Sequence, residues 1–190
     1  MASSRIGIAL RGLVPSSCGD DAACLREDGA VVLCLADGLG HGPEAAEAAR
    51  RAIAFVSEHP GLDIPETFRG CDQALRSTRG AALSIGRLRA GVLSYGAVGN
   101  TQAMVVGAKT ARFPSTPGIV GAGYATLRIE QASVREGDLV VMWSDGLKSA
   151  VGLESFGAIL LSEPQALAER ILRDFSRGTD DASVLVYREG

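Results

Sequence analysis

The apolar residues of this chain come in short runs that glycine, proline and acidic residues separate. Runs of about 4 to 8 residues are typical of strands. The strand-like runs are 5–11, 30–36, 81–88, 91–98, 102–107, 125–131, 138–143 and 182–188. The helix-like stretches are 43–57, 64–77 and 164–176, and residues 109–123, which are rich in proline and glycine, predict a loop. Strands in meanders with helices inserted between them predict an α+β sandwich with the sheets inside and the helices outside.

Length and charge narrow the class of protein. A chain of 190 residues is expected to form one domain, 1–190, with its own hydrophobic core. The net charge of −3 argues against a nucleic-acid-binding surface. No run reaches the ~18 apolar residues of a membrane span, and the apolar stretch at the N-terminus is too short for a signal peptide. The four cysteines lack metal-binding spacing and are expected to be free thiols. We therefore expect a cytoplasmic protein with no membrane contact.

Acidic residues stand where the strand-like runs begin or end. The run before Asp37-Gly38 and the run before Asp145-Gly146 are built alike, with an apolar strand, one small residue and then Asp-Gly. Two further acidic pairs, Asp20-Asp21 and Asp180-Asp181, precede apolar runs. Because antiparallel strands bring the end of one beside the start of the next, these carboxylates could share one edge of the structure.

A cluster of carboxylates needs a cation to relieve its repulsion. Oxygen ligands suit Mg²⁺ or Mn²⁺, and the chain has only two histidines, too few for a three-histidine zinc site. Two such ions about 3.5–4 Å apart would activate a water for attack on phosphorus. The alternative is that Asp-Gly is simply turn chemistry, and the spacing alone leaves both interpretations open.

Several segments resemble the motifs of one family, the bacterial SpoIIE-like protein serine phosphatases of the metal-dependent type-2C superfamily. Residues 35–46 (LADGLGHGPEAA) resemble its Asp-x-x-Gly-x-Gly-x-x-Ala signature, and residues 144–146 (SDG) its second Asp-Gly motif. Residues 179–183 (TDDAS) are similar to its closing motif, residues 18–21 (CGDD) to its opening Gly-Asp, and residues 98–101 (VGNT) to a glycine-rich turn. The motifs occur in the family's order over nearly the whole chain.

This resemblance implies a fold, a reaction and a set of ligands. The fold is a four-layer α-β-β-α sandwich with two central, mainly antiparallel sheets. The reaction is hydrolysis of phosphoserine or phosphothreonine by direct attack of a metal-bridged hydroxide, with two Mn²⁺ or Mg²⁺ ions per site. Asp37 would bridge both ions, the Gly38 carbonyl would bind one, and Asp145 and Asp180 would hold the other. Asp20 would reach its partner ion, with Asp21 as the alternative.

The match departs from the larger type-2C enzymes at two points. Those enzymes have a histidine directly after Asp-Gly, whereas here Leu39-Gly40 comes before His41. His41 is a candidate general acid, and the competing interpretation is hydrogen bonding at the start of the 43–57 helix. The relatives also supply an upstream arginine that grips the phosphate. No residue matches it, and Arg26 and Lys148 are only nearby candidates.

The resemblance also suggests partners. With no sensor segment before the first acidic motif, the chain looks most like the stand-alone phosphatases of the bacterial stressosome. The expected substrates are phosphorylated stressosome-type scaffold proteins, and the expected form is a monomer. Two alternatives remain: an inert phosphatase-fold binding module, and a hydrolase of small phosphoesters. A nucleotide-binding kinase is a poor alternative, because the chain has no G-x-x-x-x-G-K-[ST] motif. His59, before Pro60, is expected to be a surface residue.

Overall fold

The computed structural model describes residues 5–14, 16–148, 151–153, 156 and 163–190. The strands are β1 (Ile6–Arg11), β2 (Asp20–Glu27), β3 (Ala30–Gly38), β4 (Ala81–Arg89), β5 (Val92–Val98), β6 (Gln102–Val106), β7 (Ala111–Phe113), β8 (Gly118–Ile119), β9 (Gly123–Tyr124), β10 (Ile129–Ser133), β11 (Leu139–Trp143) and β12 (Ala182–Arg188). The helices of the described residues are α1 (Pro43–Glu58), α2 (Ile64–Leu75) and α4 (Pro164–Phe175).

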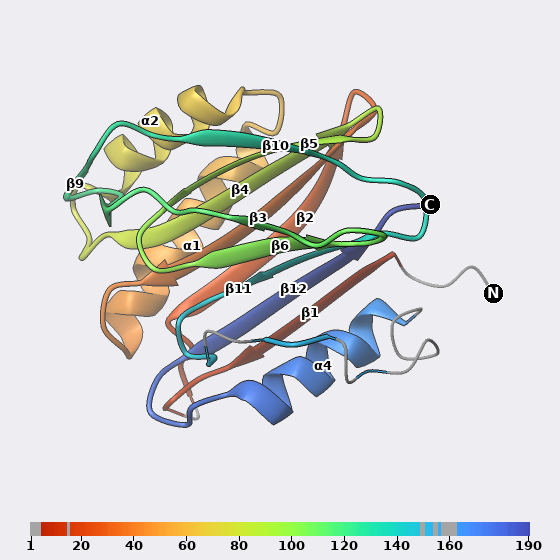
Figure 1. Ribbon diagram of the computed structural model, residues 1–190. Coiled ribbons are helices and arrows are strands. Elements are labelled where there is room, and N and C mark those ends of the chain that lie inside the picture. Colours follow the sequence, from red (N-terminus) through yellow and green to blue (C-terminus); the bar gives the residue numbers. More distant parts are fainter. Residues whose placement is uncertain (1–4, 15, 149–150, 154–155, 157–162) are drawn as a thin grey trace.

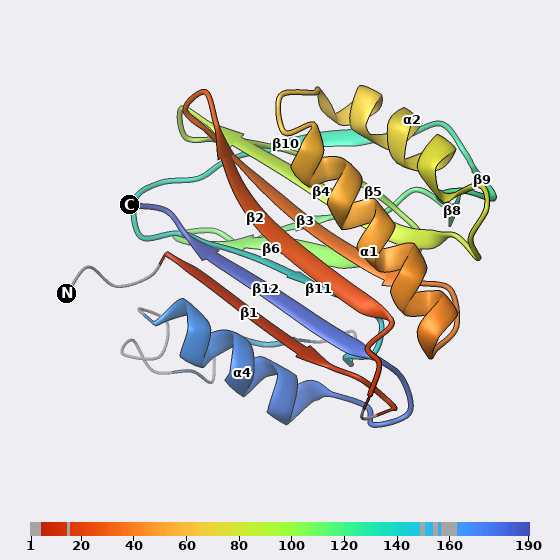
Figure 2. The same cartoon turned by 180° about the vertical axis from the view of Figure 1, so that it is seen from behind.

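The strands form two antiparallel sheets that pack face to face (Figure 1). One sheet has the order β10-β5-β4-β3-β2 and the other has the order β1-β12-β11-β6-β7, while β8 and β9 pair separately. Helices α1 and α2 cover the first sheet, and α4 covers the second, as the reverse view in Figure 2 also shows. The expected four-layer α-β-β-α sandwich is confirmed.

The alternation of side chains along β3 divides the core between the layers. Val32, Cys34 and Ala36 belong to the apolar cluster under α1 and α2. Val31, Leu33 and Leu35 belong to the cluster between the two sheets. Because side chains on a strand alternate between faces, the residue that continues the second series, Asp37, lies on the inter-sheet face at the strand end. The fold thus places a carboxylate where the space between the sheets opens.

Two predicted segments differ from the structure. Residues 109–123, expected to be a loop, contain β7, β8 and the first residue of β9. The strand expected over 125–131 instead forms over Ile129–Ser133. The backbone N–H of Ala125 donates to the carbonyl of Pro117, and that of Arg128 donates to the Thr116 hydroxyl. These amides are therefore committed to the neighbouring 116–117 segment, and the ladder with β5 begins only at Ile129.

The remaining sequence expectations concern the surface and the cysteines. Cys34 and Cys71 are buried, Cys18 and Cys24 are half-buried, and all four are free, as expected. His59 is exposed, at the C-terminal end of α1, where its ring stacks on Phe55. Among the described residues, no helix combines the length and the apolar character that crossing a membrane requires.

Candidate active site

Two of the predicted ligands come from one β-hairpin. In the antiparallel β2–β3 ladder, Asp20 pairs directly with Asp37. Directly opposed residues point to the same face of a sheet, so both carboxylates face the space between the sheets. Asp21 follows on the opposite face, where its Oδ1 accepts a hydrogen bond from the backbone N–H of Ala22 at 2.8 Å. The alternation therefore favours Asp20 over Asp21 as the partner of Asp37.

The Asp20 carboxylate is buried without hydrogen-bond partners. The residue is 3% exposed, and among the described residues neither of its carboxylate oxygens has a partner within hydrogen-bonding geometry. The hydroxyls of Ser144 and Ser183 lie close enough to lower its pKa, but burial outweighs them and raises that pKa to about 6. A buried carboxylate in this state normally has a hydrogen-bond donor or a cation beside it. The two unpartnered carboxylate oxygens of Asp20 are the kind of ligand that a divalent cation such as Mg²⁺ binds.

The other two predicted ligands stand at the ends of strands of the second sheet. Asp145 follows β11 and Asp180 precedes β12, and these strands are paired neighbours. Asp181 is 3% exposed, and its Oδ1 accepts a hydrogen bond from the backbone N–H of Leu13 at 2.7 Å. Its buried Oδ2 has no hydrogen-bond partner among the described residues, and its charge raises the pKa of Asp20. Of the acidic pair before β12, Asp180 is the residue that lines the cavity.

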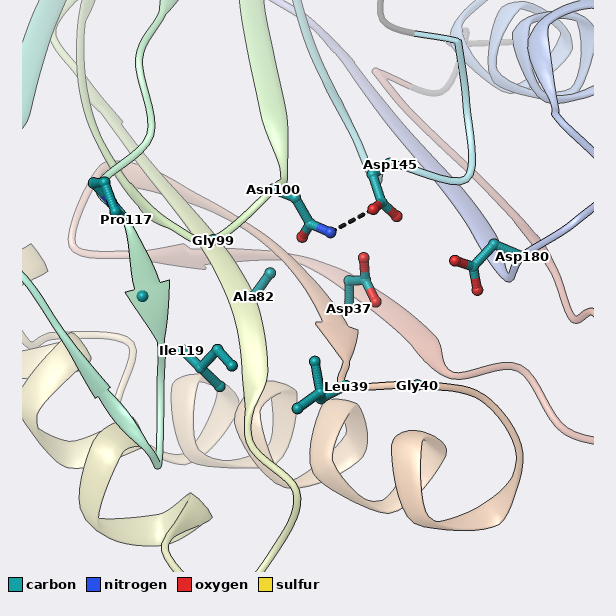
Figure 3. A pocket seen from close by; sticks show the side chains of 11 residues that line it. Asp37, Leu39, Gly40, Ala82, Gly99, Asn100, Pro117, Ile119, Asp145 and Asp180 are labelled. Atoms are coloured by element: carbon teal, nitrogen blue, oxygen red, sulfur yellow. Dashed lines mark hydrogen bonds between the residues drawn. The ribbon is translucent and has the colours of Figure 1, made fainter.

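Asp37, Asp145 and Asp180 line one cavity of about 470 Å³ at the edge where the two sheets open. Figure 3 shows Asp145 and Asp180 on one side of Asp37. The full lining is Asp37, Leu39, Gly40, Ala82, Gly99, Asn100, Pro117, Gly118, Ile119, Asp145 and Asp180. Several of these residues, including Leu39, Asn100 and Pro117, are exposed, so the cavity opens to solvent.

Asn100 lies in the turn between β5 and β6, next to the end of β11, which pairs with β6. Its side-chain amide donates a hydrogen bond to Oδ2 of Asp145, drawn as the dashed line in Figure 3. A buried hydrogen bond fixes the turn that carries Asn100. The hydroxyl of Thr101, the next residue, is hydrogen-bonded to the hydroxyl of Ser84 in β4 at 2.5 Å. The sequence identified residues 98–101 only as a glycine-rich turn. Asn100 is the residue that sequence reasoning missed, although its place between two core strands was a usable signal.

The glycines that follow Asp37 and Asp145 serve close backbone packing. A Cβ atom on Gly38 would lie 2.0 Å from the carbonyl oxygen of Ala45 in α1. A Cβ atom on Gly146 would lie 1.8 Å from the carbonyl oxygen of Asp181. Any side chain at either position would push a backbone segment away from the site, so both Asp-Gly pairs are needed for the packing that presents the carboxylates.

The cluster of negative charges disfavours ionisation in the absence of a cation. Burial, followed by the charges of Asp20, Asp145 and Asp180, raises the pKa of Asp37 to about 9. A divalent cation would reverse this shift, since it favours the charged form of its ligands. Within the described part of the chain, no three histidine, cysteine, aspartate or glutamate side chains already lie close enough together to hold a metal ion. Cation binding would therefore require the carboxylates to move closer to one another.

The other candidate residues from the sequence, His41, Arg26 and Lys148, do not line the cavity. His41 is exposed and does not line the cavity, and the start of α1 has Gly42 as its N-cap with no side-chain cap. Arg26 is exposed six residues along β2 from Asp20, at the opposite end of the strand, ~20 Å away. Lys148 is exposed, and its backbone N–H donates to the carbonyl of Phe175. Neither basic residue lines the cavity.

Comparison with known proteins agrees with this architecture. Residues 27–189 match the family Stage II sporulation protein E (SpoIIE). The chain is 26% identical over 136 residues to the phosphoserine phosphatase RsbX of Bacillus subtilis (strain 168), over 70% of this chain and 68% of RsbX.

Solved structures show the same fold. A chain from a structure described as "The bacterial stressosome: a modular system that has been adapted to control secondary messenger signaling" matches with a TM-score of 0.88 and 33% identity, over 97% of this chain and 98% of that one. RsbX in complex with magnesium matches with a TM-score of 0.80 and 19% identity, over 96% and 94%. The PP2C phosphatase domain of SpoIIE from Bacillus subtilis matches with a TM-score of 0.74 and 20% identity, over 99% and 64%. The chain therefore belongs to the SpoIIE family of PP2C-type phosphatases.

Proposed function

We propose that this protein is a metal-dependent serine/threonine phosphatase that removes phosphate from phosphoserine or phosphothreonine of a stressosome-type protein. The observation that carries the proposal is that Asp37, Asp145 and Asp180 line one solvent-open cavity, with the unpartnered carboxylate of Asp20 opposite Asp37. A buried carboxylate whose oxygens have no hydrogen-bond partner among the described residues, as at Asp20, is suited to bind Mg²⁺ or Mn²⁺.

We assign each carboxylate a role. Asp37 would bridge two ions, as the family resemblance implies; it pairs with Asp20 across the β2–β3 ladder and lines the cavity with Asp145 and Asp180. The Gly38 carbonyl would bind one ion, and Asp145 and Asp180 would hold the other. Asp20 would complete the first position, directly or through water. Magnesium in the related RsbX structure supports a divalent ion in this fold. That the ions are Mn²⁺ or Mg²⁺, and that two of them bind, is part of our proposal.

Two bound ions would supply charge neutralisation and a metal-bridged hydroxide for direct attack on the phosphorus. As the phosphorus–oxygen ester bond breaks, the leaving serine oxygen takes up a proton. His41 is the nearest histidine in sequence to Asp37 and stays the candidate donor, although its side chain is exposed outside the cavity lining. Its role would be visible as a lower kcat with unchanged Mn²⁺ affinity in His41→Ala.

The substrate assignment rests on relatives. RsbX is a phosphoserine phosphatase, and a chain at 33% identity comes from a stressosome structure. By analogy we place this chain in the same kind of signalling system, as a monomeric single catalytic domain. Its free thiols are compatible with the reducing cytoplasm.

The two alternatives predict different behaviour. An inert binding module would not need four carboxylates at this edge, and their presence argues against it. A hydrolase of small phosphoesters would be expected to enclose its substrate, whereas the exposed Leu39, Asn100 and Pro117 leave this cavity open to a protein surface.

The test is phosphate release from a phosphoserine-bearing stressosome scaffold with Mn²⁺, with Mg²⁺ and with EDTA. We expect release only with a metal ion, and a loss of at least about 100-fold in Asp37→Asn, which removes a charged ligand but keeps the shape of the side chain. Asp28→Asn is the matched control, because Asp28 is exposed in the turn at the far end of the same hairpin, at φ 47°, which asparagine tolerates. Activity in EDTA, or an active Asp37→Asn protein, would overturn the proposal.

A further inference from the structure

The catalytic cavity has an apolar wall that the proposed chemistry does not use. Leu39, Ala82, Pro117 and Ile119 line the cavity together with the three carboxylates. In Figure 3, Leu39, Ala82 and Ile119 lie on the opposite side of Asp37 from Asp145 and Asp180. The phosphate would occupy the carboxylate side, so the apolar wall faces whatever part of the substrate lies beside the phosphorylated residue.

Leu39 is an exposed side chain on a fixed backbone. Leu39 is 48% exposed, although leucine prefers burial. The backbone N–H of Leu39 donates to the carbonyl of Gly80 at 3.0 Å, so the loop after Asp37 is tied to the turn before β4. The side chain is therefore held at the cavity rather than on a freely moving loop.

Ile119 is positioned by the same turn from the other direction. The next residue, Val120, exchanges two backbone hydrogen bonds with Ala81, each of 3.0 Å. A Cβ atom on Gly80 would lie 2.6 Å from Cγ2 of Ile119, so the absence of a side chain at Gly80 lets the isoleucine approach the cavity. Leu39 and Ile119 are thus both anchored to the 80–81 segment and form one preorganised apolar surface.

Leu39 lies within a short distance of Asp37. It is two residues beyond Asp37, just after the end of β3, and two residues of chain span at most about 7 Å. In an extended substrate, side chains two positions apart point the same way over ~6.6 Å. A side chain two positions from the phosphoserine can therefore reach Leu39 while the phosphate lies at Asp37, whereas a side chain one position away points to the other face.

We propose that Leu39 and Ile119 form a subsite for a large aliphatic side chain two positions from the phosphorylated residue, so that the enzyme selects phosphosites flanked in this way. This inference rests on the proposed phosphatase function. It places part of the substrate selectivity in a short linear segment of the phosphoprotein. The expected preference is about 10-fold in kcat/KM for leucine over aspartate at that position, the low end of what apolar pockets achieve.

The test uses phosphoserine peptides in a glycine-serine background, with leucine or aspartate placed in turn two positions before, one before, one after and two after the phosphoserine. The preference is measured as a kcat/KM ratio within each protein, so that a general loss of activity cancels. In the wild type we expect the kcat/KM ratio of leucine to aspartate peptides to be raised at a position two residues from the phosphoserine. In Leu39→Ser and in Ile119→Ser this ratio should fall to about 2-fold or less. Leu13→Ser is the matched control, since Leu13 is 38% exposed and does not line the cavity; it should keep the full preference.

The outcomes separate the inference from the function on which it rests. Equal ratios at all four positions, or an undiminished preference in Leu39→Ser, would overturn the aliphatic subsite and leave the phosphatase intact. Hydrolysis of a phosphoprotein but of none of the peptides would also reject recognition of a local segment. If neither phosphoprotein nor peptide is hydrolysed with Mn²⁺ or Mg²⁺, the proposed function fails, and the subsite fails with it.

Discussion

Asp20 and Asp37 stand directly opposite each other across the β2–β3 ladder, where both carboxylates face the space between the two sheets. Like charges placed directly opposite on a sheet are destabilising, and here they are also withdrawn from water. Burial is the main reason that the pKa values of both groups are raised; the charges of Asp181 and Asp145 add to the shift of Asp20, and those of Asp20, Asp145 and Asp180 add to the shift of Asp37. A cation between the pair would turn the repulsion into shared coordination, which makes their relationship the central feature of the site.

The hairpin distinguishes Asp20 from its neighbour in sequence. We expect Asp20→Asn to weaken Mn²⁺ binding by about 10- to 100-fold, since a charged ligand is lost. Asp21→Asn should change it by less than about 3-fold, because the Asp21 carboxylate lies on the other face of β2 and accepts from the Ala22 amide. Isothermal titration calorimetry with Mn²⁺ measures both variants. A larger effect of Asp21→Asn would show that the ligand is the second acidic residue.

The stability of the metal-free protein should fall as pH rises. The folded-state pKa of Asp37 is about 9, above its usual value of ~3.9, so between these values the folded state holds a proton that the unfolded state has lost. Its contribution to stability is therefore complete below about pH 4 and is lost progressively up to about pH 9, with a slope of at most about 1.4 kcal/mol per pH unit. Asp20 adds to this fall between about pH 4 and pH 6.

Thermal unfolding in EDTA between pH 5 and pH 8 measures this dependence. The Tm of the wild type should fall more steeply with pH than that of Asp37→Asn, which cannot ionise at that position. Added Mn²⁺ should stabilise the wild type most at the high end of the range, because metal and protons compete for the same carboxylates. Parallel curves for the two metal-free proteins would contradict the proposed burial of charge at Asp37.

Asn100 should act as a positioning residue for Asp145. Its amide occupies Oδ2 of that carboxylate and so fixes its orientation. Asn100→Ala should weaken Mn²⁺ binding by about 10-fold, the effect typical of removing a partner of a metal ligand. Because Asn100 is exposed, Tm should change little. Partial rescue by Asn100→Ser, which restores a donor, would separate orientation of Asp145 from a general disturbance of the turn, and unchanged metal affinity in Asn100→Ala would refute the role.

The close contact behind Asp37 should make Gly38 intolerant of any side chain. Gly38→Ala places a Cβ atom against the carbonyl of Ala45, and overpacking of this kind costs about 3 kcal/mol or more. The expected result is a clearly lowered midpoint of urea unfolding. Gly61→Ala is the control, since a Cβ atom there meets nothing within 4 Å, and its stability should be unchanged or slightly raised. Equal stability of the two variants would mean that α1 can move away without loss.

Much of the architecture could be predicted because local patterns specify it. The apolar runs that became β3, β4, β5, β11 and β12 are buried strands whose boundaries lie within a residue or two of those expected. The expectation failed over 125–131, where the pattern is strand-like but the backbone amides of Ala125 and Arg128 bond to the 116–117 segment. Which hydrogen-bond partner these amides choose depends on a segment that is not adjacent in sequence, so the local sequence pattern does not reveal it.

The sequence by itself determined that carboxylates stand at strand ends and that glycines follow two of them, because apolar periodicity and Asp-Gly pairs are local features. Only the tertiary structure shows that Asp20, and not Asp21, faces the space between the sheets, and that Asp180 lines the cavity. A shift of one residue reverses the face of a strand, and the face is set by pairing with a partner elsewhere in the chain. The contact of Asn100 with Asp145, 45 residues apart, likewise exists only once β6 pairs with β11, because that pairing sets the turn before β6 beside the end of β11.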